Sequence, residues 1–183
     1  MDYSWRFEFW YFFLRRSPRD EGRVEALVLR TPGGGTGARE IVQEAEFSPE
    51  LGMHGDRWSS EEKRRPGNQV SLVNIHVISS FAKDAESRAE CGDNLHVDLE
   101  LAEKNLPVGT RLEVGDVLLE ITPEPHRPCK KFARRYGETA VKKVFRSDKK
   151  GRRTRGVLCQ VLRAGRVRTG DSIRVLRGSE SAL

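Results

Sequence analysis

Cys129 has the sequence neighbourhood that most clearly predicts chemistry. The run Thr122-Pro-Glu-Pro-His-Arg-Pro-Cys129 leads to it, and Lys130 and Lys131 follow it. Proline disfavours the helical conformation of the residue before it, so the approach to the cysteine should be extended. A helix that begins at or just after Cys129 would place the thiol at the positive end of a helix dipole, among cations. Both features stabilise a thiolate, the form that attacks electrophiles and binds soft metals.

The other two cysteines have different surroundings. Cys159 alternates with Val157 and Val161, which predicts a buried position on one face of a strand. Cys91 lies in an acidic loop, where carboxylates oppose formation of a thiolate. The sequence has no Cys-x-x-Cys pair, which argues against a disulfide framework and a structural zinc site and fits a reducing cytoplasm. A small buried cysteine is the structural alternative for Cys129.

Few other residues are spaced for catalysis. His126, three residues before Cys129, is a candidate to tune the thiol or to bind an oxo ligand. His54 and His76 are not spaced for a zinc site. Ser71 lacks the Gly-x-Ser-x-Gly turn that is typical of serine hydrolases. Among these residues, His126 is therefore the candidate to act together with Cys129.

Positive charge is concentrated in one segment of the chain. Residues 126–155 contain thirteen Lys or Arg and two acids, a local charge of +11 in a chain whose net charge is +6. This distribution predicts an anionic ligand or partner. The densest part, 146–155, is either a solvated loop or a phosphate-binding segment, and Arg155 is the best candidate for a phosphate contact. Nucleic-acid binding is the distant alternative, because the segment has few aromatic side chains to stack on bases.

Apolar periodicity predicts a mainly β domain. Strands are expected at 24–29, 41–47, 70–73, near 97, at 112–114, 117–121 and 157–162, and in a final hairpin at 167–175. Helices are expected at 75–85, after an Asn74 cap, and at 130–136 and 140–145. The glycine-rich run 31–37 lacks the Gly-Lys-Ser/Thr of a phosphate loop and predicts a hairpin loop. The pattern indicates an antiparallel β-barrel decorated by a few α-helices.

Residues 1–21 are predicted to be an aromatic extension of this domain. Their apolar run, 9–14, is cut off by Arg15 and Arg16 and is too short to span a bilayer. It also lacks the pattern of an export signal, so a cytoplasmic location is expected. The extension should form a short helix packed on the domain, with contact to a membrane surface as the lesser alternative. The domain is assigned to 22–178, and a tail to 179–183.

Six sequence blocks resemble, in order, those of one known family. They are Gly52-Met-His-Gly-Asp-Arg-Trp58, Asn68-Gln-Val-Ser-Leu-Val73, Gly92-Asp-Asn-Leu95, Pro125-His-Arg-Pro-Cys-Lys-Lys-Phe132, Arg155-Gly-Val-Leu-Cys-Gln-Val-Leu162 and Gly165-Arg-Val-Arg-Thr-Gly-Asp171. The family is the MOSC domain, named after the C-terminal domain of molybdenum cofactor sulfurases, and the resemblance covers about residues 22–176. It implies a MOSC-type β-barrel. It also gives Cys129 the role of the family's cysteine, which carries sulfur or binds the metal.

The resemblance implies a molybdenum cofactor, which is an anionic molybdopterin, with Cys129 as a ligand of its metal. Cys129 and His126 are the implied catalytic residues. The residues predicted to bind the cofactor are Asp56, Arg57, Asn94, Arg127 and Arg155. Loop structure alone is an alternative explanation for the first three.

Some members of the family reduce N-hydroxylated compounds, so the first functional expectation is a small molybdenum-dependent oxidoreductase. The sequence shows no flavin or iron–sulfur motif, so reduction would need a separate electron donor. The alternative is a non-catalytic carrier, which holds sulfur as a persulfide or delivers the cofactor to an acceptor molybdoenzyme. Pyridoxal phosphate is only a family-level association, because the large sulfurase domain that binds it has no counterpart in this sequence.

Overall fold

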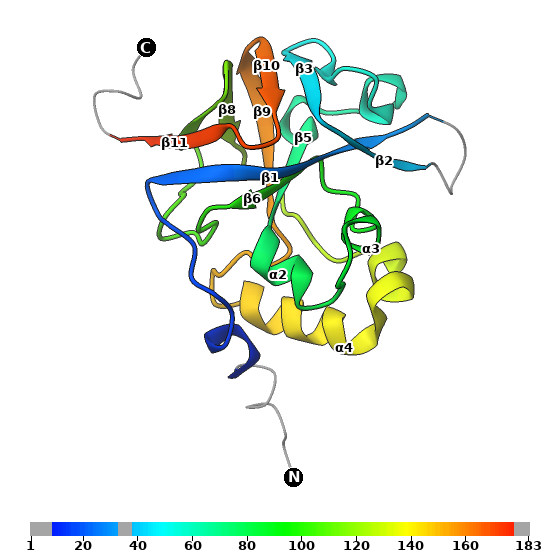
Figure 1. Ribbon diagram of the computed structural model, residues 1–183, viewed down its shortest axis with the longest axis vertical. Coiled ribbons are helices and arrows are strands. Elements are labelled where there is room, and N and C mark those ends of the chain that lie inside the picture. Colours follow the sequence, from blue (N-terminus) through cyan, green and yellow to red (C-terminus); the bar gives the residue numbers. More distant parts are fainter. Residues whose placement is uncertain (1–8, 33–37, 178–183) are drawn as a thin grey trace.

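The computed structural model describes residues 9–32 and 38–177, and a β-barrel is the centre of the structure (Figure 1). Its strands are β1 (Glu21–Arg30), β2 (Arg39–Val42), β3 (Glu44–Ser48), β4 (Gly52–Met53), β5 (Val70–Asn74), β6 (Leu95–Asp98), β7 (Arg111–Val114), β8 (Val117–Ile121), β9 (Val157–Arg163), β10 (Gly165–Arg168) and β11 (Ser172–Leu176). The predicted strands at 70–73, 112–114, 117–121 and 157–162 are confirmed within a residue at each end.

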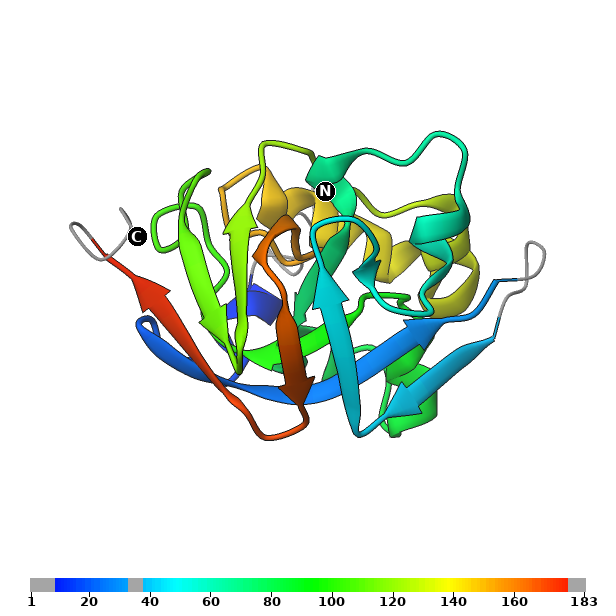
Figure 2. The same ribbon diagram turned by 90° about the horizontal axis from the view of Figure 1, so that it is seen from above.

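Seven strands close the barrel. Their order is β11-β7-β8-β9-β5-β6-β1, and β1 pairs with β11 to complete the ring. The strand β1, blue in Figure 2, can do this because it pairs with β11, β6 and β2 in turn along its length. Among the described strands of this sheet, only β5 and β6 pair in parallel. The predicted mainly β barrel with helices around it is confirmed, with one parallel pair among its antiparallel ladders.

Alternate side chains of the strands fill the barrel. On β9, Val157, Cys159 and Val161 are buried, and the residues between them are partly exposed. Leu72 on β5 and Leu119 on β8 are also inaccessible to solvent. Removal of such side chains from water is the main favourable term in folding. The predicted core position of Cys159 is confirmed.

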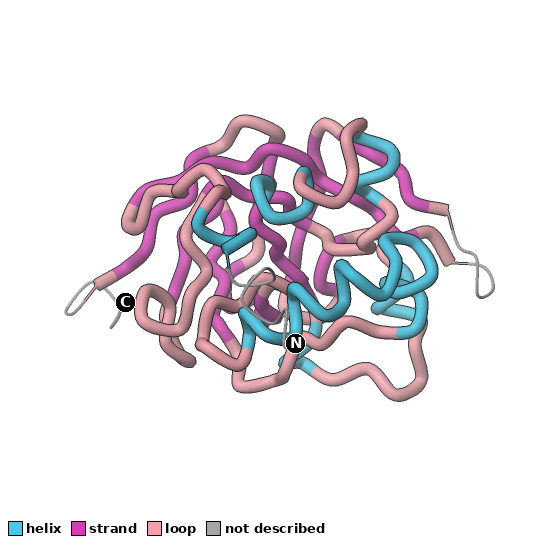
Figure 3. Tube along the Cα trace, turned by 90° about the horizontal axis from the view of Figure 1, so that it is seen from below, coloured by secondary structure: helices cyan, strands magenta, loops and turns pink. Residues whose placement is uncertain are grey.

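Three α-helices, α2 (Ile75–Ser79), α3 (Ala85–Ala89) and α4 (Lys130–Asp148), gather on one side of the barrel (Figures 1 and 3). Two short 3-10 helices, η1 (Arg57–Ser60) and η2 (Pro66–Asn68), lie in the connection between β4 and β5. α4 is bent at Gly137, whose φ of 82° suits a residue without a side chain. The bend separates the two predicted helical stretches, 130–136 and 140–145. Phe132 and Tyr136 share one face of α4, as predicted, with ring centroids 4.8 Å apart.

One predicted helix is wrong. The apolar stripe at 75–85 predicts a single helix, but the structure has α2 and α3, separated by residues 80–84. Asn74 caps α2, as predicted, by accepting hydrogen bonds from the backbone N–H groups of His76 and Val77. Asp84 caps α3 and accepts a hydrogen bond of 2.7 Å from the N–H of Ser87. The second cap starts a new helix inside the stripe, and periodicity alone does not separate the two.

Two predictions fail at turns between strands. The stripe at 41–47 predicts one strand, but a break at Gln43 divides it into β2 and β3, which lie in different sheets. The final hairpin at 167–175 is also wrong. A turn is present at Gly170, but β10 pairs with β3, and β11 pairs with β7 and β1. Turn residues predict a change of direction and do not determine which strands pair. Most of the predicted hairpin loop at 31–37 lies outside the described residues.

The aromatic N-terminal segment packs on the helices. Residues 9–12 are helical. Trp10 stacks on Phe81 with 5.2 Å between ring centroids, and its Nε1 donates a hydrogen bond of 3.1 Å to Ser80 Oγ. Among the described residues, no helix is long and apolar enough to cross a bilayer. The domain limits at 22 and 178 stay predictions, and the predicted tail lies outside the described residues.

Candidate functional site

Cys129 is the residue immediately before α4. Its backbone is extended, with φ −95° and ψ 172°, and its side chain makes no capping hydrogen bond. Cys129 is exposed to solvent, whereas Cys91 and Cys159 are buried. The predicted helix start is therefore confirmed, and the alternative of a buried structural cysteine at this position is wrong.

The segment that leads to Cys129 has no regular secondary structure, as its prolines predict. It is fixed at its start by Thr122, whose Oγ1 lies 2.6 Å from the carbonyl oxygen of Gly67 and 3.1 Å from that of Leu158. Further along, His126 and Arg127 help to line a cleft of about 710 Å³. A cleft of this volume is within the range of small-molecule sites.

A buried ionic group lies behind this segment. Asp93 is inaccessible to solvent, and its Oδ2 lies 2.6 Å from Arg155 Nη1. Its other oxygen lies 3.3 Å from His126 Nε2, within ion-pairing distance. Arg155 Nη2 donates a hydrogen bond of 3.3 Å to the carbonyl oxygen of Cys91. The Arg155 guanidinium also lies over the ring of Phe132, 5.1 Å from its centroid. Asp93 therefore joins two of the predicted site residues.

The protonation states of Asp93 and His126 are determined by their burial and by the positive charge of Arg155. Burial disfavours ionisation of Asp93, but Arg155 outweighs it and lowers the pKa of the carboxyl group. Burial, aided by the Arg155 charge, lowers the pKa of His126 to about 3. Asp93 is thus a carboxylate and His126 a neutral imidazole near pH 7. Burial also disfavours the charged form of Arg155, but the charge of Asp93 outweighs it and raises the pKa of the guanidinium.

A second polar group lies around Asp56, which is inaccessible to solvent. Arg30 holds its carboxylate through Nε and Nη2, at 2.8 and 2.7 Å. The backbone N–H of Trp58 donates to the same carboxylate at the start of η1. Asn94 Nδ2 donates a hydrogen bond of 3.0 Å to Asp56 Oδ2, and Asn94 Oδ1 accepts one of 3.1 Å from the N–H of Ser71. Burial favours a protonated Asp56, but the bonds from Arg30 outweigh it and lower the pKa.

The two groups meet at Asp93 and Asn94, which are consecutive in the loop before β6. The structure thereby brings together four of the predicted residues, Asp56, Asn94, His126 and Arg155. Cys129 immediately precedes α4, whose first turn carries Phe132, the residue over whose ring Arg155 lies. The contacts of Asp56 and Asn94 are those of a loop-fixing network, so a direct role of either against a ligand stays a prediction.

Arg57 and Arg127 are not part of these two groups. Arg57 Nε, at the start of η1, lies 3.5 Å from Oε1 of Glu61, the residue that follows this short helix. Arg127 is exposed at the cleft. Arg57 does contribute to a cationic region, because it acts together with Arg135 and with burial to lower the pKa of Arg39. A cofactor-binding role of Arg57 and Arg127 stays a prediction.

Sequence reasoning missed Asp93, Arg30, Arg39 and Arg135. Asp93 stands beside the predicted site residue Asn94 in the block Gly92-Asp-Asn-Leu95, so this position in the sequence could have indicated it. Arg30 is the last residue of β1, before the glycine-rich run, and Arg39 is the first residue of β2, after it. Nothing in the local pattern relates either residue to Cys129. The described residues contain no group of three or more His, Cys, Asp or Glu arranged to hold a metal ion.

Comparison with known proteins gives the family. The model of the MOSC domain family matches residues 53–174. A search of curated protein sequences finds no match. The solved structure of the YuaD protein from Bacillus subtilis is similar, with a TM-score of 0.63 and 20% identity, over 85% of this chain and 95% of that chain.

Two structures of YiiM are also similar. YiiM from Escherichia coli gives a TM-score of 0.56 and 21% identity, over 85% of this chain and 70% of that chain. YiiM from Geobacillus stearothermophilus gives a TM-score of 0.59 and 14% identity, over 85% and 75%. At these identities the similarity concerns the fold. The matched segment contains most of the barrel, both polar groups except Arg30, and Cys129, and the chain therefore belongs to the MOSC domain family.

Proposed function

We propose that this protein binds the molybdenum cofactor with the Cys129 thiolate as a ligand of the metal, and that it is an oxidoreductase of N-hydroxylated compounds. The observation that carries the proposal is the exposed thiol at the start of α4, a helix whose Phe132 packs against Arg155 of the buried Arg155–Asp93 pair. A thiolate is a preferred ligand for a soft metal centre. Positive charge and a helix N-terminus both favour that ionised form.

The surrounding residues fit an anionic pterin. His126 Nδ1 and Arg155 Nε are buried, and neither has a hydrogen-bond partner among the residues described in the structure. Buried polar atoms of this kind call for a partner from outside the chain. Arg127 offers a guanidinium group at the cleft, and such a group suits phosphate oxygens. When bound, the cofactor supplies a redox-active molybdenum.

His126 fits a positioning role better than that of a proton donor. Its pKa of about 3 keeps the imidazole neutral near pH 7, so Nδ1 or Nε2 carries a lone pair. Asp93 lies 3.3 Å from Nε2, which favours the proton on Nε2 and the lone pair on Nδ1. Nδ1 would then accept a hydrogen bond from the substrate or the cofactor. The protons for reduction would come from solvent at the exposed thiol end of the site.

Reduction of an N–OH group to N–H consumes two electrons and two protons and releases water. The electrons would come from a separate donor protein, because the sequence shows no flavin or iron–sulfur motif. The test is turnover of an amidoxime by metal-loaded protein with a chemically reduced dye as donor. Turnover that is lost in Cys129→Ser supports the reductase. Metal-loaded wild-type protein that gives no turnover with any reduced donor contradicts it.

A sulfur or cofactor carrier is the second candidate, and the exposure of Cys129 favours it. A persulfide on an accessible thiol can pass its outer sulfur to an acceptor, whereas a buried thiol cannot. A carrier would activate an acceptor apoenzyme and would show no turnover with the reduced dye. We prefer the reductase, because His126 Nδ1 and Arg155 Nε are buried without a hydrogen-bond partner among the described residues, which favours a cofactor held by the protein.

A further inference from the structure

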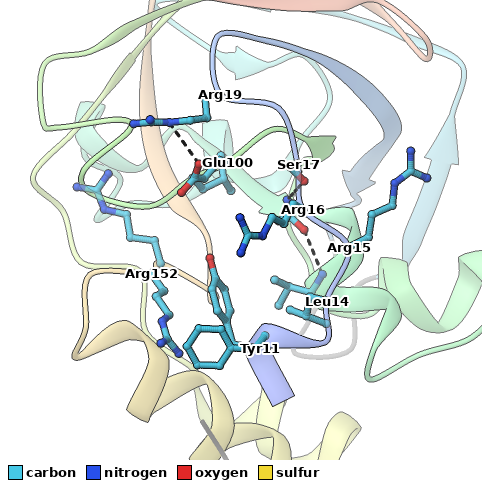
Figure 4. Close-up of a pocket in the computed structure, with 13 residues that line it drawn as sticks. Tyr11, Leu14, Arg15, Arg16, Ser17, Arg19, Glu100 and Arg152 are labelled. Atoms are coloured by element: carbon cyan, nitrogen blue, oxygen red, sulfur yellow. Dashed lines mark hydrogen bonds and ion pairs between the residues drawn. The ribbon is translucent and has the colours of Figure 1, made fainter. Parts of the chain in front are cut away.

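A second cavity lies between the aromatic N-terminal segment and the basic loop that follows α4 (Figure 4). Its volume is about 310 Å³, and its walls are residues 11–19, the junction of β5 and α2, residues 100–101, and residues 152–153. No residue of the groups around Asp93 and Asp56 lines it. The cavity brings together the aromatic N-terminal segment and two residues of the basic segment, Arg152 and Arg153. The proposed function assigns no role to either.

The lining of this cavity is strongly cationic. It includes one acid, Glu100, and five arginines, Arg15, Arg16, Arg19, Arg152 and Arg153. Arg19 pairs with Glu100 at 3.5 Å, and Arg153 donates a hydrogen bond to the carbonyl oxygen of Leu106. The other arginines leave a net positive charge on the lining, with Arg16 on one side of the cavity and Arg152 on the other. Like charges held together in this way destabilise the chain unless an anion offsets them.

Arg152 is held in place by two aromatic rings. The carbon at the centre of its guanidinium lies 4.4 Å from the ring centroid of Tyr11 and 5.0 Å from that of Phe12. The rings fix the plane of the guanidinium, which prepares it for bidentate contact with a phosphoryl group. Arg152 Nη1 is shielded from solvent and has no hydrogen-bond partner within residues 9–32 and 38–177. A preformed donor without an acceptor indicates a missing anion.

Arg16 and Tyr11 face the same space. Figure 4 shows the Arg16 side chain extending to the middle of the cavity and the Tyr11 hydroxyl pointing toward it, whereas Arg15 points away. Burial, followed by the charge of Glu100, raises the pKa of Tyr11. The hydroxyl therefore keeps its proton near pH 7 and can donate a hydrogen bond to an anion. Arg16 and the Tyr11 hydroxyl thus offer donors to the middle of the cavity, and the Arg152 guanidinium adds a positive charge beside the Tyr11 ring.

We propose that this cavity binds the phosphoryl group of a small soluble molecule, held by Arg16 and Arg152 and by the Tyr11 hydroxyl. Planar guanidinium groups are the preferred donors to phosphate oxygens. The volume, about 310 Å³, admits a phosphoryl group with a short organic body. The recess between these four wall segments favours a soluble ligand over the flat surface of a bilayer. The proposal is independent of the cofactor assigned to Cys129.

The test is calorimetric titration of the full-length protein with inorganic pyrophosphate. Saturable binding to wild-type protein is expected. Arg16→Gln and Arg152→Gln should each weaken it by at least about tenfold, because each removes a charge-assisted contact. Arg15→Gln is the matched control, because it removes the same charge from the same segment but from a side chain that points away. This control should bind almost as the wild-type protein does.

Three outcomes would overturn the proposal. The first is no saturable binding to the wild-type protein. The second is an equal loss of binding in Arg15→Gln and Arg16→Gln, which would indicate a general charge effect. The third is recruitment to vesicles of phosphatidylserine in phosphatidylcholine, lost in Arg16→Gln and unaffected by pyrophosphate, which would assign the surface to a membrane. Arg16 is an exposed side chain, so its replacement tests the site without loss of the fold.

Discussion

Arg155 Nη1 lies 2.6 Å from Asp93 Oδ2, and neither side chain is more than 6% exposed. The pair connects the turn between α4 and β9 with the loop before β6, and His126 lies against the second oxygen of Asp93. A buried charge is costly unless it is paired. The pair therefore fixes this turn, this loop and the segment that contains His126 as one unit.

Replacement of Asp93 should test this unit. Asp93→Asn leaves the Arg155 charge buried without its partner, and the free energy of unfolding should fall by about 3–5 kcal/mol. Addition of Arg155→Met to the same protein should restore part of the loss. The measurement is urea unfolding of the two single variants and the double variant.

The matched control for this measurement is Glu113→Gln, which breaks an ion pair of 2.7 Å with the exposed Arg174. Solvent screens that pair, so the loss should stay below about 1 kcal/mol. An Asp93→Asn protein that loses no more stability than the control would show that the buried pair does not hold the site together.

Thiol reactivity should follow exposure. A limiting amount of iodoacetamide near pH 7 should label Cys129 at least about tenfold faster than the buried Cys91 and Cys159. Burial raises the pKa of both buried thiols, which lowers their thiolate fraction further. Peptide mapping by mass spectrometry gives the order of labelling. Modification of Cys91 or Cys159 before Cys129 would assign the reactive thiol elsewhere.

Stability should fall as the pH is lowered from about 6.5 to about 4. Burial lowers the pKa of His96 to about 4, so the unfolded chain binds this proton more readily than the folded protein does. The contribution of His96 is complete above pH 6.5, near its unfolded pKa, and is lost progressively down to about pH 4, on the order of 3 kcal/mol in total. His126 contributes in the same direction.

The measurement is the urea midpoint of the wild-type protein and of His96→Gln at several pH values in that window. His96→Gln should be less stable at pH 7 and should show a shallower decline toward pH 4. Parallel curves for the two proteins would show that His96 does not cause the decline.

The basic residues should not make this a nucleic-acid-binding protein. Few aromatic side chains accompany the charge in residues 126–155, so binding to DNA should be weak and without sequence preference. It should be lost steeply between about 50 and 200 mM salt, because it depends on counterion release. Fluorescence anisotropy with labelled oligonucleotides measures this dependence. A tight complex that persists at physiological salt would reverse the order of the candidate functions.

The sequence predicted local features well where turns and periodicity act over a few residues. The strand position of Cys159, the helix start after Cys129 and the Asn74 cap are all of this kind. Strand pairing was less predictable, because the Gly170 turn leads from one sheet to another. The apolar stripe at 75–85 could not reveal the Asp84 cap that divides it.

The candidate site was predictable only in part. His126 and Cys129 are near each other in the sequence, so their proximity could be predicted. Asp93 reaches Arg155 across 62 residues, and Arg30 reaches Asp56 across 26. Such contacts depend on the closure of the barrel, which local patterns do not specify. For this reason the sequence did not predict the buried Asp93–Arg155 and Asp56–Arg30 ion pairs.

The molybdenum content of the purified protein shows whether Cys129 holds the metal. Wild-type protein, Cys129→Ser and Cys159→Ala would be purified from a host that makes the molybdenum cofactor, and their molybdenum would be measured by mass spectrometry. Cys159→Ala removes a thiol from the core and serves as the control. We expect stoichiometric molybdenum in the wild-type protein and the control, and little in Cys129→Ser, with unchanged circular dichroism. Equal molybdenum in Cys129→Ser, or none in the wild-type protein, would contradict the account.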